Sequence, residues 1–154
     1  REQSLARALH PVLDRYDFVL IDCQPSLGLL TVNALACADS VLIPMECAYF
    51  SLRGLALLND TVNKVRDRLN PKLKLSGILV KMFDSRTLHA REVMERVVEV
   101  FGDVVFDSVV NRTVRFPETS VAGEPIISWA PKSAGAAAYR ALAREVIARD
   151  VGLV

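Results

Sequence analysis

The chain has 154 residues, of which 51% are hydrophobic and 24% are charged, and its formal net charge is +1. This length suits one domain with a sizeable core, and the composition is typical of a globular protein. A net charge this small does not predict nucleic-acid binding. Only a local patch of basic residues could indicate such a partner. We see no signal peptide and no apolar run near the roughly 20 residues that cross a bilayer, so we expect a cytoplasmic protein without a membrane partner.

The cysteines and histidines suggest no metal site. Cys23, Cys37 and Cys47 are odd in number and form no CxxC motif. This favours reduced thiols over disulfides or zinc, and packing over catalysis. His10 and His89 lie far apart along the chain, so the sequence offers no obvious ligand set.

The first forty residues predict a helix, a strand and a second helix. Residues 1–15 carry leucines at helical spacing. Phe18 to Ile21 is a short apolar run bounded by turn signals, which is typical of a strand buried on both faces. Asp22 would then lie at the carboxyl end of that strand. Ser26 is a reasonable N-cap for an apolar helix over 27–38.

A second buried strand is predicted at Val41 to Pro44, with the proline ending it. The next helix begins at Ser51, shows a clear amphipathic stripe, and stops at Asn70-Pro71. Its outer face and exit carry five basic residues, which a solvated helix face would explain. They are Lys64, Arg66, Arg68, Lys72 and Lys74.

The second half continues the alternation of strands and helices. In chain order we expect a strand over 75–83, a helix over 90–101, a strand over 104–110, a polar connection over 111–125, a short extended piece over 126–129 and a helix over 133–149. Strands separated by helix-length segments are typical of βαβ units, so we predict an α/β fold with a parallel sheet flanked by helices. With no repeat or interdomain linker visible, residues 1–154 are expected to form a single domain.

The position of Asp22 suggests a chemical role. Open α/β sheets place ligands at the carboxyl ends of their strands. In P-loop nucleotide hydrolases an aspartate at such a place helps to hold the Mg²⁺ that is bound to the nucleotide phosphates. Because an apolar run ending in aspartate is common, the pattern alone leaves a plain strand-end role for Asp22 equally open.

Longer strings carry a resemblance to a known family. LIDCQPSLGLLTVNAL closely resembles the Walker B and switch II segment of the ParA/Soj family of partition ATPases. These are SIMIBI-class P-loop NTPases with a deviant Walker A motif, and MinD is a relative. VLIPMECAYFSLRGL, GILVKMFDSRTLHAREV and VVNRTVRFPETSVAGEPIISWAPKSAGAAAYRALAREV resemble later family segments in the same order. The resemblance therefore covers nearly the whole chain.

One expected motif is missing. The chain has no GKT or GKS, which a P-loop needs to hold phosphates. The resemblance thus implies the C-terminal portion of a ParA-like ATPase domain, without the N-terminal P-loop. We expect the chain as given not to hydrolyse ATP.

The resemblance implies roles for residues by position. Asp22 matches the family's catalytic aspartate, which the resemblance links to Mg²⁺ through water. Switch II matches Gln24, Pro25, Ser26, Leu27 and Gly28. The family usually has a second proline at the position of Gln24. The two loops that hold adenine match Met82, Phe83, Asn111, Arg112 and Thr113. For Met82, core packing is an equal alternative. In the second loop this chain has Asn-Arg-Thr where the family usually has Pro-Arg-Asn, so we expect nucleotide contacts from the backbone rather than from these side chains.

Two family positions for nonspecific DNA binding match Arg86 and Arg115. Arginine suits phosphate because its guanidinium is always charged and can fork onto two oxygens. Contacts with phosphates give affinity without reading sequence. Ordinary surface charge is the alternative for both residues, and the basic cluster over 64–74 could extend the same surface.

The function implied by the resemblance is chromosome or plasmid partitioning. The intact protein would bind ATP and Mg²⁺, form an ATP-dependent homodimer, bind DNA on the nucleoid and be stimulated by a ParB-like partner. One alternative is a MinD-like positioning ATPase, which the end of the chain, REVIARDVGLV, disfavours because it lacks a basic amphipathic tail. The other is a non-catalytic α/β scaffold module, which the missing P-loop favours.

Overall fold

The computed structural model describes residues 3–24, 26, 28–48, 51–150 and 152. They form two compact units that interleave along the chain. Unit 1 comprises Arg1–Val41 and Gly54–Leu75, and unit 2 comprises Leu42–Arg53 and Ser76–Val154. The single domain expected from the sequence stays a prediction.

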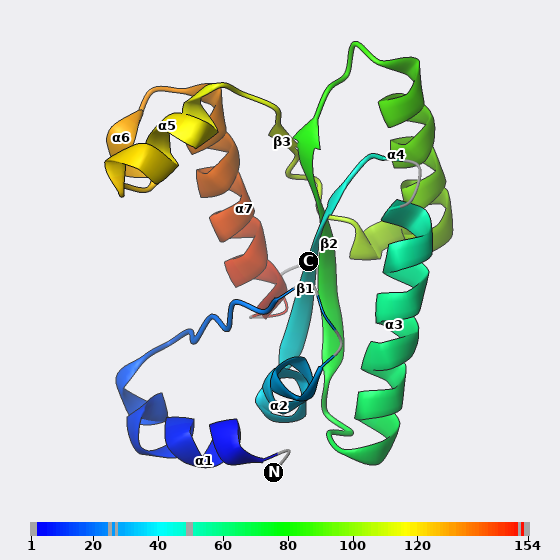
Figure 1. Cartoon of the computed structure of the whole chain (residues 1–154), viewed down its shortest axis with the longest axis vertical. Helices are drawn as coiled ribbons and strands as arrows, with labels where there is room; N and C mark the ends of the chain where they lie inside the picture. The colour runs from blue at the N-terminus through cyan, green and yellow to red at the C-terminus, as the bar shows by residue number, and fades with distance from the viewer. Residues whose placement is uncertain (1–2, 25, 27, 49–50, 151, 153–154) are drawn as a thin grey trace. The chain divides into compact units, whose positions relative to one another are not determined.

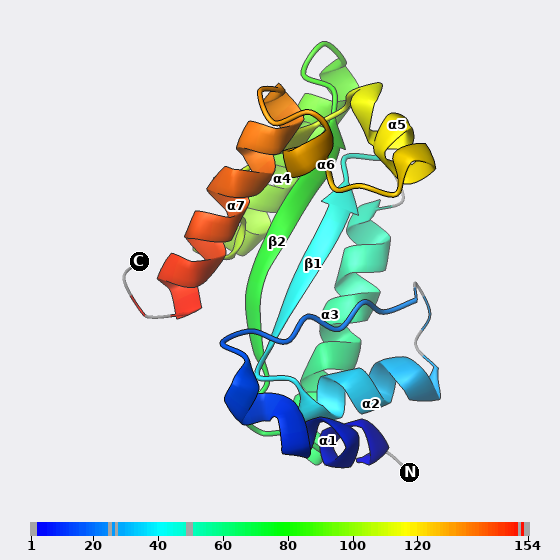
Figure 2. The same cartoon turned by 90° about the vertical axis from the view of Figure 1, so that its left-hand side faces the viewer.

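Unit 1 is helical. It contains α1 (Ser4–Leu9), the 3-10 helix η1 (His10–Arg15), α2 (Leu29–Cys37) and most of α3 (Ser51–Arg68). Its core joins the end of α2 to the apolar stripe of α3, and the buried members are Leu35, Val62, Val65 and Leu73. Figures 1 and 2 both show α1 beside α2. The predicted helices of this region are therefore confirmed, although the first one changes to 3-10 geometry after Leu9.

Asn70 fixes the end of α2. Its side-chain nitrogen donates hydrogen bonds to the carbonyl oxygens of Leu35 at 3.0 Å and Ala38 at 2.7 Å. The last carbonyl groups of a helix have no partner within the helix, so these bonds act as a C-cap supplied from a distant part of the chain. The residue predicted only to stop α3 thus also joins the two helices.

The predicted strand at Phe18 to Ile21 is wrong. These residues form neither helix nor strand, and Leu20 is 90% exposed. A strand needs a hydrogen-bonded neighbour, and none of the described strands pairs with this run. Asp22 is correspondingly exposed and does not follow a buried strand.

The sheet has three strands in the order β1-β2-β3. They are β1 (Ser40–Glu46), β2 (Lys74–Phe83) and β3 (Val110–Asn111). β2 and β3 run parallel, with Lys81 opposite Val110 and Phe83 opposite Asn111. The α/β class and the parallel sheet are therefore confirmed, and β2 matches its predicted range closely.

Helices α4 (Leu88–Phe101) and α7 (Ala134–Asp150) pack against the strands of unit 2. Figure 1 shows them on opposite sides of β2. The core that α7 covers contains Leu79, Phe106, Val110 and Leu142, all buried. The long apolar faces of the two helices explain this arrangement, because each must bury its stripe against the sheet.

Three predictions for unit 2 need correction. Pro44 does not end its strand but lies inside β1, where an outer strand of the described sheet can tolerate a residue without an N–H group. The strand expected over 104–110 is reduced to β3, with a 3-10 helix, η2 (Gly102–Val104), and an isolated bridge before it. Residues 111–125 contain α5 (Arg115–Ala122), and the expected extended piece is α6 (Ile126–Trp129). Periodicity cannot separate such short apolar runs into strand and helix.

Candidate functional site

The carboxyl ends of β2 and β3 bring together the residues predicted to hold adenine. Phe83 lies opposite Asn111, and the backbone N–H of Arg112 donates to the Phe83 carbonyl oxygen at 2.9 Å. Met82 and Thr113 are half-buried beside this pairing. Two loops predicted separately from the sequence thus meet at one edge of the sheet, where parallel sheets place their ligands.

Met82 occupies an unusual backbone conformation. Its φ is +53°, and the register of β2 against β3 shifts between Lys81 and Phe83. The left-handed region costs an L-residue with a Cβ roughly 1–2 kcal/mol. Strain of this kind persists only where the surroundings enforce it, and it clusters at binding sites. The shift turns the backbone at the position where a ligand would approach the sheet.

An ion pair that the sequence analysis missed lies near this edge. Lys81 Nζ is 2.9 Å from Glu46 Oε1, which joins the ends of β1 and β2. Both side chains are more than one-third exposed, so the pair contributes about 0–1 kcal/mol. Its effect is to hold the end of β1 against the residue that precedes Met82.

Arg86 is held by Asp84 in the loop that follows β2. Its Nε and one terminal nitrogen lie 2.8 Å from the two carboxylate oxygens of Asp84, and its backbone N–H donates to the same carboxylate at 3.1 Å. The side-chain and backbone hydrogen bonds from Arg86, with a smaller contribution from the charge of Arg112, lower the pKa of Asp84 to about 2. The loop then ends at Thr87, whose hydroxyl caps α4.

Arg115, the second predicted DNA contact, is also paired. It begins α5, and one of its terminal nitrogens lies 3.2 Å from Glu118 Oε2, one turn along the helix. Residues three apart on a helix are neighbours on its surface. Each arginine expected to meet DNA therefore has an acidic partner close to it in sequence.

Asp22 and switch II belong to unit 1. Asp22 lines an open hollow of about 560 Å³ with Gln24, Thr31 and Asn33 among its other lining residues. Ser26 is not the predicted N-cap, since Gly28 occupies that position and makes no side-chain cap. The Ser26 carbonyl oxygen instead accepts the hydroxyl of Thr31 at 2.6 Å.

The predictions for Pro25 and Leu27 lie outside the described residues. Among the part of the chain that the structure describes, no group of three or more His, Cys, Asp or Glu could hold a metal ion. A lone exposed carboxylate such as Asp22 nevertheless suits Mg²⁺, which is commonly bound by one or two carboxylates, water and substrate phosphates.

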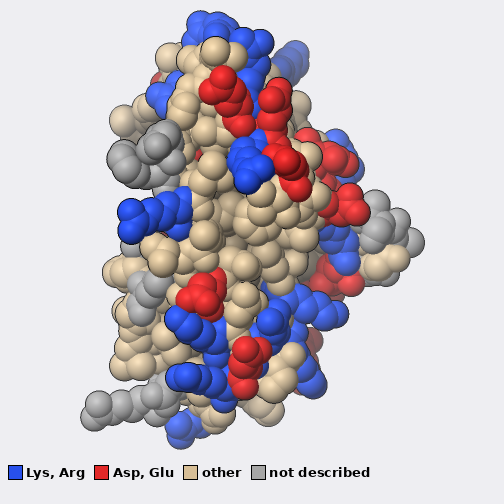
Figure 3. Space-filling model, turned by 90° about the vertical axis from the view of Figure 1, so that its right-hand side faces the viewer, with Lys and Arg blue, Asp and Glu red and all other residues tan. Residues whose placement is uncertain are grey.

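The basic cluster over 64–74 is partly neutralised. Lys64 pairs with Asp60 at 2.7 Å, and Arg66 lies 3.6 Å from Asp67. In the lower half of Figure 3, Lys and Arg side chains lie beside Asp and Glu side chains on this face. This favours the solvated-face interpretation of the cluster.

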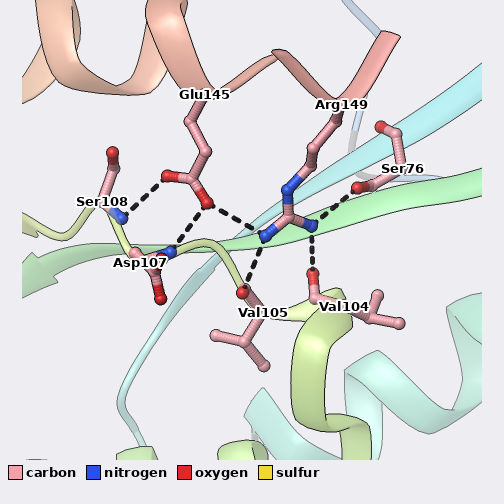
Figure 4. Close-up of polar contacts among 7 residues, drawn as sticks. All are labelled: Ser76, Val104, Val105, Asp107, Ser108, Glu145 and Arg149. Carbon is pink, nitrogen blue, oxygen red and sulfur yellow. Dashed lines mark hydrogen bonds and ion pairs between the residues drawn. The ribbon is translucent and has the colours of Figure 1, made fainter. Parts of the chain in front are cut away.

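Sequence reasoning missed a polar network that ties α7 to the sheet (Figure 4). The guanidinium of Arg149 donates to the carbonyl oxygens of Ser76, Val104 and Val105 at 3.0–3.2 Å and to Glu145 at 2.9 Å. It also lies over the ring of Phe106, 4.1 Å from the centroid. No short sequence motif predicts such contacts, because the three carbonyl groups belong to segments far from Arg149 in sequence.

Glu145 completes this network. Its carboxylate accepts the backbone N–H groups of Asp107 at 2.9 Å and Ser108 at 3.0 Å. Burial alone would raise the pKa of Glu145, but these hydrogen bonds and the one from Arg149 outweigh it, so the pKa lies below its ordinary value. The carboxylate thus stays ionised and holds the loop after η2 against α7.

The three cysteines are free, as expected. Burial raises the pKa of the Cys37 and Cys47 thiols, which makes them less reactive at neutral pH. None of the described helices is long and apolar enough to cross a membrane.

Comparisons with known proteins agree with this fold. A family model described as an AAA domain matches residues 1–75. An uncharacterized protein of Mycobacterium tuberculosis is 78% identical over 97% of this chain and 47% of its own length. The chromosome-partitioning ATPase Soj of Treponema pallidum is 49% identical over 97% of this chain and 59% of its own length.

Solved structures give the same result. Cobyrinic acid a,c-diamide synthase from Mycobacterium smegmatis, solved with an ATP analog and magnesium, matches with a TM-score of 0.77 and 35% identity over 96% of this chain and 53% of its own. The cell division ATPase MinD of Pyrococcus furiosus matches with a TM-score of 0.73 at 22% identity, over 95% of this chain and 58% of its own, which bears on the fold alone.

The chain has the α/β fold of P-loop ATPases. Within that class its sequence is similar to the chromosome-partitioning ATPase Soj over nearly the whole of this chain. It spans about half of the length of the curated relatives that it matches.

Proposed function

We propose that this chain is part of a partition ATPase that binds ATP with Mg²⁺, dimerises, and binds DNA nonspecifically until a ParB-like partner stimulates hydrolysis. The observation that carries the proposal is the meeting of the two predicted adenine loops. Phe83 and Asn111 face each other at the carboxyl ends of β2 and β3, with a strained Met82 beside them. A plain scaffold would have no need for strain at this edge of the sheet.

In this proposal each group has a limited task. The backbone of Phe83 and Arg112 and the side chain of Met82 bind and orient the base. Asp22 positions the Mg²⁺ through water, and the ion neutralises charge on the phosphates. Gln24 to Gly28 report the state of the nucleotide to the dimer interface. A phosphate-binding segment upstream of Arg1 would have to supply the P-loop.

DNA binding would use Arg86 and Arg115. Both are exposed at the end of the sheet or on α5, where phosphates can approach. Their acidic neighbours make each a weaker phosphate ligand than a free arginine, so affinity would depend on several contacts acting together. Dimerisation doubles their number, which offsets the small net charge of the chain.

A gel shift tests this proposal, using the protein with its upstream P-loop segment present. We expect DNA binding that needs ATP and falls at least tenfold in the Arg86→Ala/Arg115→Ala variant. An Arg96→Ala/Arg144→Ala variant removes the same charge from exposed positions of α4 and α7 and serves as the matched control. Binding of ATP without any binding of DNA would refute the DNA function and favour a MinD-like role. Absence of ATP binding would favour the scaffold alternative.

A further inference from the structure

We propose that Asp84 restrains DNA binding by holding Arg86 in a bidentate ion pair that a DNA phosphate must break. The inference rests on the proposed DNA-binding function. It concerns a residue with no role in that proposal, placed between the base-binding Phe83 and the phosphate-binding Arg86.

The geometry supports a restraint. Both guanidinium bonds to Asp84 are 2.8 Å long and use the same two-pronged arrangement that a phosphate would use. A carboxylate and a phosphate therefore compete for one face of Arg86. The backbone N–H of Arg86 donates to the same carboxylate at 3.1 Å, which gives Asp84 a further contact besides the guanidinium.

The exposure of the two partners is unequal. The Arg86 side chain is 86% exposed, whereas that of Asp84 is 24% exposed. Asp84 is thus the anchored partner and Arg86 the one that can leave for a ligand in solution. The low pKa of Asp84 means that the carboxylate is charged at any physiological pH, so the restraint is permanent and is not a pH switch.

Asp84 also lies next to the nucleotide loops. Arg112 is bonded to Phe83, the residue before Asp84, and its charge acts on the Asp84 carboxylate. Of these two arginines, only Arg86 is hydrogen-bonded to the Asp84 carboxylate, and Arg112 acts on it through its charge alone.

The variant Asp84→Asn isolates the charge. Asparagine keeps a side-chain oxygen for the Arg86 backbone N–H, and the Asp84 carbonyl oxygen that accepts Thr87 is unaffected. The loop should therefore keep its shape while the competing carboxylate is lost. Asp103→Asn is the matched control, because it removes one charge at the far end of α4, about 20 Å along a helix of 14 residues.

The test measures affinity for a fixed duplex by gel shift or anisotropy across a salt series, with the upstream segment and ATP present. Breaking an exposed ion pair corresponds to about a two- to fivefold gain in affinity per protomer for Asp84→Asn. Asp103→Asn should change affinity much less. The gain should disappear in Asp84→Asn/Arg86→Ala, because the released arginine is then absent.

Each other result overturns the inference in a recognisable way. A loss of affinity in Asp84→Asn would mean that the carboxylate orients Arg86 for phosphate. A gain that survives in the double variant, or that Asp103→Asn matches, would mean a general charge effect. If the wild type binds no DNA, the proposed function fails together with this inference. If the wild type binds DNA but Arg86→Ala alone changes nothing, this inference fails and the proposed function stands.

Discussion

Arg149 is the residue whose removal we expect to destabilise unit 2 most clearly. Its guanidinium closes four hydrogen bonds and covers the ring of Phe106. Its side chain is only 19% exposed and that of Glu145 15%. Arg149→Ala would therefore leave a mostly buried carboxylate without its cation and three carbonyl groups without a donor.

The size of the effect follows from these contacts. Removing one partner of a buried ion pair costs about 3–5 kcal/mol. Two backbone N–H groups still compensate Glu145 in the variant, and water can reach the vacated carbonyl groups, so we take the lower end. We expect a loss of about 3 kcal/mol for Arg149→Ala, which for a protein of this size lowers Tm by roughly 6–12 °C. Arg149→Lys should recover part of it, because an ammonium group keeps the charge but not the fork.

Urea denaturation of the chain, followed by fluorescence of Trp129, measures this loss. Trp129 is the single tryptophan and lies in α6, which packs against α7, so its signal reports the unit that contains the network. Arg144→Ala is the matched control. It removes the same side chain from an exposed position of the same helix and should change stability by less than about 0.5 kcal/mol.

The pH dependence gives a second readout of the same network. Because the pKa of Glu145 is lowered by folding, its contribution is present above the unfolded pKa and is lost as the pH falls through the folded pKa. The wild type should thus lose stability faster than Glu145→Gln as the pH falls below about 4. Equal stability losses for Arg149→Ala and Arg144→Ala, or parallel acid profiles, would refute the reasoning.

Two further predictions concern single backbone positions. Gly77→Ala should lower the stability by about 1–3 kcal/mol, because the added Cβ would overlap the buried Phe106 ring. Gly54→Ala has open space around the added Cβ inside α3 and should raise the stability by about 0.5–1 kcal/mol. Thermal melts compare the two variants, and equal Tm values would contradict the packing around Gly77. Met82→Gly should weaken ATP binding about fivefold or more, because the apolar contact with the base is lost. It should not lower Tm, because glycine removes the strain at φ +53°. Unchanged ATP affinity by calorimetry would mean that Met82 only packs in the core.

Long periodic patterns predicted the fold well. The amphipathic stripe of α3 and the continuous apolar run of β2 were sufficient because each places several residues in the core. Short apolar runs were not sufficient. Phe18 to Ile21 and 126–129 have strand-like composition, yet one has no strand beside it among the described residues and the other begins directly after Pro125 and turns into a helix.

The candidate site divides in the same way. Phe83 and Asn111 could be predicted to meet because each lies at the carboxyl end of a parallel strand, and these ends share an edge of the sheet. The strained backbone of Met82 could not, since a positive φ at methionine has no sequence signature. The network of Arg149 was equally invisible, because its acceptors are backbone carbonyl groups that any residue carries.

The pairing of the two predicted DNA-binding arginines shows how an error in secondary structure reaches the site. Arg115 and Glu118 stand three apart, which means contact on a helix and nothing definite in a loop. A polar connection over 111–125 would give Arg115 no defined neighbour, whereas α5 places Glu118 3.2 Å from it. Asp84 and Arg86 form the same kind of pair within a turn. The positive charge of Arg86 and Arg115 is therefore partly neutralised by the acidic residues beside them. DNA would meet less net positive charge at these two positions than the arginines alone suggest.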